Sequence, residues 1–169
     1  MKKYLFIILV LSHIFTYSLA HANDVYAHQQ NKKQAIETVL NSFHQAAATA
    51  NGKKYFDLLT EDSVFLGTDA TERWTKKQFK AFALPYFSKG KGWLYTPIQR
   101  HINLHKKGKV AFFDELLTNA TYGKCRGTGI LWLTDQGWKI AQYNLSIPIP
   151  NAIAGDLVKR IQRHEKNNK

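Results

Sequence analysis

Four closely spaced residues, Asp69, Glu72, Arg73 and Trp74, form the most chemically suggestive group in the sequence. Two carboxyl groups beside an arginine could divide the roles of acid and base, because an apolar wall raises a carboxyl pKa and a nearby cation lowers it. The structural alternative is that Asp69 forms a turn after Gly67, Glu72 pairs with Arg73, and Trp74 joins the core. We therefore treat Asp69 and Glu72 as candidate catalytic residues, and Arg73 and Trp74 as candidate ligand-binding residues.

A second group comes from predicted strands, in which alternate side chains face opposite sides of a sheet. Glu115 and Arg126 lie on neighbouring predicted strands and could meet across them. Inside the fold such a pair would orient a polar ligand, whereas on the surface it would contribute only about 0–1 kcal/mol. On the last predicted strand, the pattern leaves open which side faces a pocket. Tyr143 could donate to a developing oxyanion, and Asn144 could contact a ligand.

The histidines do not form a convincing metal site. His101 and His105 would share one face of a strand but lie about 13 Å apart. His44 lies beside the apolar stripe of the first predicted helix, where a partly exposed position is the simpler interpretation. The sequence also lacks a Gly-rich phosphate loop, a Ser-His-Asp order and a pair of cysteines. We therefore expect neither a metal ion nor a cofactor.

The secondary-structure elements that must position these residues are predicted to be mainly helices in the first part of the chain and strands in the second. Apolar spacing predicts helices over 36–47 and 54–59. A capping box at Thr75 predicts a third helix, which Pro85 kinks or ends. A strand is predicted over 63–67, between the second and third helices. Turn signals then separate four strands, over 93–105, 110–118, 126–134 and 138–146. This order predicts an α+β fold in which helices wrap a curved antiparallel sheet into a cone with a central pocket.

Short strings along the chain resemble one family in their order and spacing. They are Phe65 to Asp69, Glu72 to Trp74, Gly92-Trp93, Phe113 to Glu115, Arg126 to Gly129, and Trp138 to Ser146. The chain resembles the SnoaL-like branch of the nuclear transport factor 2 superfamily, the cone fold of ketosteroid isomerases and polyketide cyclases. The resemblance implies a pocketed domain and a possible homodimer through the sheet face. It does not imply one activity, because this fold hosts many functions.

The first 22 residues have the three parts of a secretory signal. Lys2 and Lys3 precede an apolar run, and Ala20-His21-Ala22 fits the cleavage rule. The run is shorter than the roughly 20 residues of a membrane-spanning helix, so we expect cleavage after Ala22 and no membrane span in the mature chain. The expected product is periplasmic or secreted. It consists of a flexible leader over 23–31, a cone domain over 32–150, and a C-terminal amphipathic helix with a basic tail over 151–169.

The net charge of +12, or +10 without residues 1–22, is spread along the chain without a nucleic-acid motif. We therefore expect no nucleic-acid partner. Cys125 is the only cysteine, which excludes an intramolecular disulfide.

The leading hypothesis is an exported domain that binds a small molecule. One alternative is an acid-base enzyme of the isomerase or cyclase type, and another is a non-catalytic adaptor whose basic surface binds an anionic partner.

Overall fold

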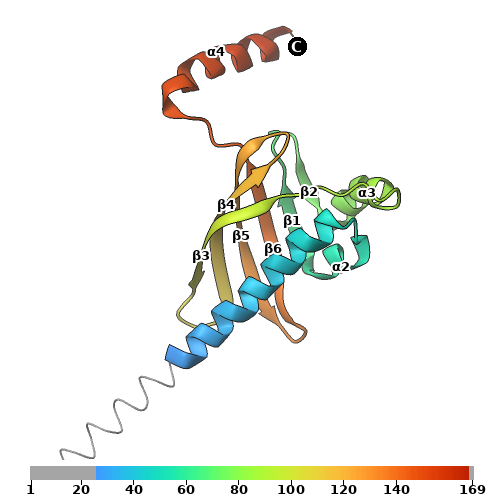
Figure 1. The fold of residues 1–169 in the computed structure, drawn as a ribbon, viewed down its shortest axis with the longest axis vertical. Helices are drawn as coiled ribbons and strands as arrows, with labels where there is room; N and C mark the ends of the chain where they lie inside the picture. Colours follow the sequence, from blue (N-terminus) through green and yellow to red (C-terminus); the bar gives the residue numbers. More distant parts are fainter. Residues whose placement is uncertain (1–25, 168–169) are drawn as a thin grey trace, which may run out of the picture.

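Residues 26–167 are described by a computed structural model and form a curved six-stranded sheet with helices against one face (Figure 1). This arrangement confirms the predicted α+β class. A helix over residues 26–48 comes first. The elements that follow are α2 (Gly52–Asp57), β1 (Leu59–Leu66), β2 (Arg73–Thr75), α3 (Lys76–Phe87), β3 (Thr96–Leu104), β4 (Val110–Asn119), β5 (Gly123–Thr134), β6 (Gly137–Ser146) and α4 (Asn151–Asn167). The predicted signal segment lies outside the described residues.

The strands lie in the order β2-β1-β6-β5-β4-β3. The four strands from β3 to β6 form the predicted antiparallel meander. The predicted curved antiparallel sheet is confirmed, with one parallel pair, β1 and β6, within it. The chain reaches this arrangement by passing over the sheet from β1 through α3 before it returns to the far edge at β3. Parallel neighbours require such a long crossover connection.

The N-terminal helix runs diagonally across the inner face of the sheet (Figure 1). Its buried residues Ile36, Leu40, Phe43 and Ala47 follow the predicted helical spacing. The described part of this helix begins at residue 26. Residues 26–31 are therefore helical, although we predicted a flexible leader over 23–31. Lys32 connects the first turns of this helix to the turn between β3 and β4, because its Nζ donates to the carbonyl of Gly108 at 3.3 Å.

Helix α3 begins with the predicted capping box, in which the side chains of Thr75 and Gln78 each bond to the other residue's backbone. Pro85 lies inside the helix, which continues two residues further to Phe87. The buried face consists of Phe79, Ala83 and Phe87. Phe82 and Tyr86, which also follow the apolar spacing of the helix, are exposed. The helix therefore presents one of its aromatic rows to solvent beside β2.

The core between the helices and the sheet is rich in aromatic rings. Phe43 stacks on Tyr55 with centroids 4.4 Å apart, and Phe65 stacks on Phe79 at 3.9 Å. Helix α4, by contrast, has no buried residue and extends beyond the end of the sheet (Figure 1). Within residues 26–167, no helix is both long and apolar enough to cross a membrane.

Candidate functional site

Aromatic rings from several elements surround a cleft of about 230 Å³ at one end of the inner face. We call it the aromatic cleft. Its lining consists of Phe65, Gly67, Thr68, Glu72, Trp74, Phe79, Phe82, Trp93, Tyr95, Tyr122 and Leu145. Burying aromatic and aliphatic surface of this kind is the usual way in which a protein binds a small organic molecule.

Local structure explains why these rings meet. Strand alternation points Phe65 of β1 and Leu145 of β6 toward the helices, where both are buried. Trp74 of β2 stacks on Phe79 at 5.3 Å and contacts Phe82 at 4.8 Å, because the capping box begins α3 directly after it. Trp93 is held at the opposite side, where its backbone N–H donates to the carbonyl of Ala47 at 3.2 Å.

The turn between β1 and β2 supplies the polar rim of the aromatic cleft. The Oε2 atom of Glu72 accepts from the backbone N–H of Asp69 at 3.2 Å, and the half-buried Glu72 side chain lines the cleft. Asp69 is exposed, and its Oδ1 accepts from the backbone N–H of Thr71 at 2.8 Å and from its hydroxyl at 2.6 Å. These hydrogen bonds from Thr71 lower the pKa of Asp69. Asp69 therefore shapes the turn, as in the structural alternative.

Tyr95 faces Glu72 across the same cleft. Burial is the main cause that raises the pKa of Tyr95 to about 12, and the nearby negative charge of Glu72 adds to it. The phenol is therefore protonated at neutral pH and can donate a hydrogen bond. Glu72 is the only carboxyl group among the residues that line the cleft, and no histidine, lysine or arginine is among them.

A separate polar network lies beneath the N-terminal helix, with Glu115 buried at its centre and Glu37 and Asn41 at the surface. The side chain of Glu115 has 0% exposure. Its Oε1 accepts from the hydroxyl of Tyr143 at 2.9 Å and lies 2.7 Å from Nε2 of His44. Its Oε2 accepts from Nε of Arg100 at 2.7 Å. Arg100 also donates to Glu37 at 2.6 Å and to Asn41 at 2.7 Å. We call these residues the Glu115 network.

The Glu115 network contains a buried carboxylate rather than a neutral acid. Burial raises the pKa of Glu115, but the hydrogen bond from His44 and the charges of His44 and Arg100 outweigh it, so the pKa lies below its ordinary value of 4.5. Burial and the negative charge of Glu115 raise the pKa of Tyr143 well above 10.0. The hydroxyl of Tyr143 thus stays protonated, and it donates its hydrogen bond to Glu115.

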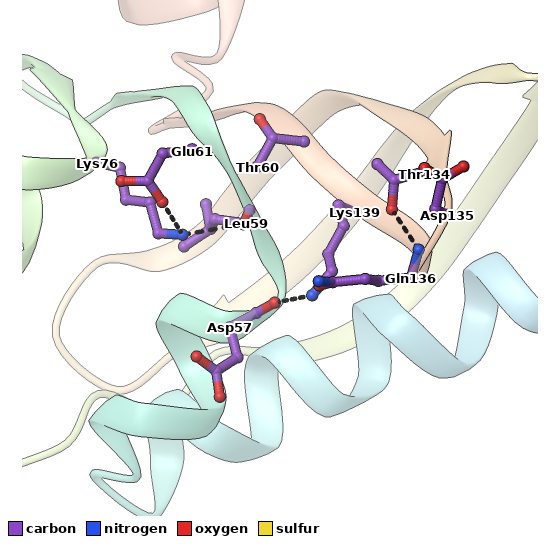
Figure 2. Close-up of a pocket in the computed structure, with 9 residues that line it drawn as sticks. All are labelled: Asp57, Leu59, Thr60, Glu61, Lys76, Thr134, Asp135, Gln136 and Lys139. Carbon is purple, nitrogen blue, oxygen red and sulfur yellow. Dashed lines mark hydrogen bonds and ion pairs between the residues drawn. The ribbon is translucent and has the colours of Figure 1, made fainter.

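A wider polar cleft of about 660 Å³ lies at the other end of β1 and β6 (Figure 2). Figure 2 shows Lys76 reaching toward Leu59 and Glu61, while Lys139 donates to the backbone carbonyl of Asp57. Both ammonium groups already have partners within the protein. This cleft is larger than the aromatic cleft, but Leu59 is the only apolar residue among those that line it, so it offers little apolar surface to a ligand.

The match to known proteins agrees with this architecture. Residues 36–150 match the family model of the SnoaL-like domain. This chain belongs to the SnoaL-like family. The resemblance predicted from the sequence is therefore confirmed. None of the curated proteins matches the chain.

Solved structures similar to this SnoaL-like domain share its fold at low sequence identity. A candidate aromatic ring hydroxylase from Novosphingobium aromaticivorans has a TM-score of 0.60 at 18% identity, over 71% of this chain and 91% of that one. A candidate dehydratase of the NTF2-like family from Streptomyces avermitilis has a TM-score of 0.59 at 10% identity, over 69% and 96%. An NTF2-like protein with a cystatin-like fold from N. aromaticivorans has a TM-score of 0.58 at 12% identity, over 79% and 92%.

The structure brings only part of the predicted site of this SnoaL-like domain together. Glu72 and Trp74 line the aromatic cleft. Arg73 alternates with Trp74 along β2 and is exposed. On β6, the inner face carries Tyr143 and Leu145, while Asn144 lies on the opposite face with its neighbour Gln142. Asn144 therefore does not reach the aromatic cleft.

The predicted contact between Glu115 and Arg126 is wrong. In the register of β4 and β5, Glu115 lies opposite Gly127, and Arg126 lies opposite Leu116. Because neighbouring residues on a strand face opposite sides, Glu115 points inward and Arg126 is exposed on the outer face. The cation that pairs with Glu115 comes instead from Arg100, which lies opposite it on β3.

The sequence analysis favoured a partly exposed His44, and this interpretation is wrong, because His44 is buried in the Glu115 network. Arg100, Glu37 and Asn41 were not among the predicted site residues. A signal for His44 was present, because it lies four residues after Leu40 and three before Ala47, on the buried side of the helix. Arg100 alternates with Ile102 and Leu104 on the inward side of β3. Within residues 26–167, no group of three histidine, cysteine, aspartate or glutamate residues is placed to hold a metal ion.

Proposed function

We propose that this SnoaL-like domain is exported and binds a small, mainly apolar molecule in the aromatic cleft. The observation that carries this proposal is the convergence of seven aromatic side chains on one open hollow: Phe65, Trp74, Phe79, Phe82, Trp93, Tyr95 and Tyr122. Its volume lies below the roughly 300–1,000 Å³ of sites for drug-sized ligands, so it suits a molecule of one or two rings.

The polar groups of the cleft suggest the orientation of such a ligand. Glu72 accepts hydrogen bonds at the rim, so a hydroxyl or amino group on the ligand would bind there, with the ring system against the aromatic side chains that line the cleft. Apart from Glu72, no carboxyl group, histidine, lysine or arginine is among the residues that line the cleft. The lining is therefore mainly apolar, which supports binding of a mainly apolar molecule.

A binding measurement with the neutral two-ring fluorescent probe 2-naphthol tests the cleft. Replacing Phe82 with alanine is expected to weaken binding by about tenfold, because an aromatic wall contributes through both apolar area and ring contact. Phe82 is 45% exposed, so the change leaves the core intact.

Tyr86→Ala is the matched control, since Tyr86 lies one turn further along α3, is 47% exposed and does not line the cleft. Probe affinity should stay within about twofold of the wild type for this variant. Equal losses for both variants would show that the probe binds to the exposed surface of α3, and binding in the aromatic cleft would be rejected.

The export part of the proposal is supported by the basic start, the apolar run and the Ala20-His21-Ala22 site. Expression in a Gram-negative host should give a periplasmic protein whose intact mass corresponds to a chain beginning at Asn23. Ala22→Arg should leave the precursor unprocessed, because a large charged side chain does not fit the cleavage rule. A wild-type chain that keeps Met1 and stays in the cytoplasm would contradict export.

A further inference from the structure

Helix α4 separates its apolar and basic residues onto opposite sides. At 100° per residue, Ile153, Leu157, Val158 and Ile161 lie within one arc of less than half the circumference. Four cations lie on the opposite arc, Lys159, Arg160, Arg163 and Lys166, together with Asp156, which pairs with Lys159 at 3.8 Å. The four aliphatic residues recur from residue 153 to residue 161, and His164 and Glu165 lie on their arc only at the C-terminal end of the helix.

Most of this apolar side is exposed, Leu157 is half-buried, and His164 at the C-terminal end of the same arc acts electrostatically on Asp69 of the β1–β2 turn. Helix α4 has no buried residue, and Ile153, Val158 and Ile161 are all exposed. The short segment before it, with Ile147 and Ile149 also exposed, contains two prolines that favour an extended backbone. This segment carries α4 away from the sheet (Figure 1). The helix is therefore built to meet a surface other than its own domain.

We propose that α4 binds the surface of an anionic lipid bilayer and lies parallel to it. Such a helix buries its aliphatic side at the boundary of the acyl chains and places its cations among the headgroups. A groove on a protein would bury the aliphatic side equally well, but it would leave the four opposite cations in water. The bilayer uses both sides of α4, since each cation can contact a lipid phosphate.

The net charge of the chain supports the same partner. The excess of basic residues gives +10 after removal of residues 1–22, so the long-range field of the protein favours approach to a negative surface. Lipid binding through α4 is independent of the aromatic cleft, which lies among β1, β2, α3 and the segment before β3. The two proposals therefore fail or succeed separately.

Sedimentation with lipid vesicles tests the proposal on the purified full chain. The protein should bind vesicles of phosphatidylcholine with about 30% phosphatidylglycerol far more strongly than vesicles of phosphatidylcholine alone, and the difference should shrink as salt rises. The double variant Arg160→Gln/Arg163→Gln should lower the partition coefficient on anionic vesicles by about 25-fold, because each cation near the surface contributes about fivefold.

A matched charge control, Lys106→Gln/Lys107→Gln, removes two exposed cations at the turn between β3 and β4 and should have little effect. For the aliphatic side, Ile153→Ser/Ile161→Ser should lower binding by at least about tenfold. Phe112→Ser is its control, because Phe112 on the outer face of β4 is as exposed as Ile153, at 55%. All variants keep the same N-terminal residues, so any binding through that segment is common to them.

Three results would overturn the proposal. The first is the absence of binding to anionic vesicles. The second is binding that the α4 variants and the controls reduce equally. The third is a concentration-dependent dimer, seen by analytical ultracentrifugation without lipid, that Ile153→Ser/Ile161→Ser abolishes, since α4 would then bind a second copy of the chain.

Discussion

Replacing Glu115 with alanine is expected to lower the free energy of unfolding by about 3–5 kcal/mol, because it leaves a buried charge without its partner. The guanidinium of Arg100 would lose the acceptor of its Nε–H, and the hydroxyl of Tyr143 would lose its only acceptor in the Glu115 network. Urea unfolding followed by circular dichroism measures the change. A loss of this size would be a large fraction of the stability of a domain of this length.

The neighbouring residue provides the control. Asp114 carries the same charge on the same strand but is exposed on the outer face, so Asp114→Ala should change the free energy of unfolding by no more than about 0.5 kcal/mol. Acid adds a second test. Since the folded-state pKa of Glu115 is below its ordinary 4.5, its stabilisation is fully present above that value and is lost as the pH falls through the lower folded-state pKa. The wild type and Glu115→Ala should therefore converge in acid. A gap that stays constant down to the acid transition would contradict a role for the ionised carboxylate.

Gly127→Ala is expected to destabilise the domain by about 1–3 kcal/mol, the usual range for overfilling a packed core. Gly127 lies opposite Glu115 on β5, and a Cβ atom there would lie 2.4 Å from the hydroxyl of Tyr143 and 2.8 Å from Oε1 of Glu115. Neither side chain can move away without giving up the hydrogen bond between them. The substitution thus tests the packing of the network without removing any of its polar groups.

Gly155→Ala serves as its counterpart in α4. Nothing lies within 4 Å of a Cβ at Gly155, and alanine is the better helix former by roughly 0.5–1 kcal/mol. Helical content should rise slightly, and the unfolding midpoint should not fall. If Gly127→Ala proved as harmless as Gly155→Ala, the close approach of β5 to the Glu115 network would be refuted.

The elements of the fold could be predicted because their signals are local. Thr75 and Gln78 lie three residues apart, and the turn before Gly137 lies between two strands that pair with each other. The pairing of β1 with β6 has no such signal. Leu59 and Ile140 are about 80 residues apart, and both strands consist of the apolar and polar residues that an antiparallel neighbour would also accept.

The site was less predictable than the fold because it depends on register. Glu72 and Trp74 could be found, since they flank one short turn and strand. The partner of Glu115 could not, because a shift of one residue between β4 and β5 decides whether Arg126 faces inward or outward. Arg100 could be selected only once its position opposite Glu115 was known. Likewise, Phe82 and Tyr86 follow the same helical stripe, and only the placement of α3 shows which one lines the cleft.

The parallel contact between β1 and β6 also constrains how the chain reaches its native state. During synthesis, β1 appears long before β6, and until then its only possible partner strand is β2, which has three residues. Closing a loop of about 80 residues is a slow, late event compared with forming the hairpins from β3 to β6. The hairpins should therefore form the folding nucleus, and β1 should join last, leaving an apolar strand exposed to aggregation or to a chaperone in the meantime.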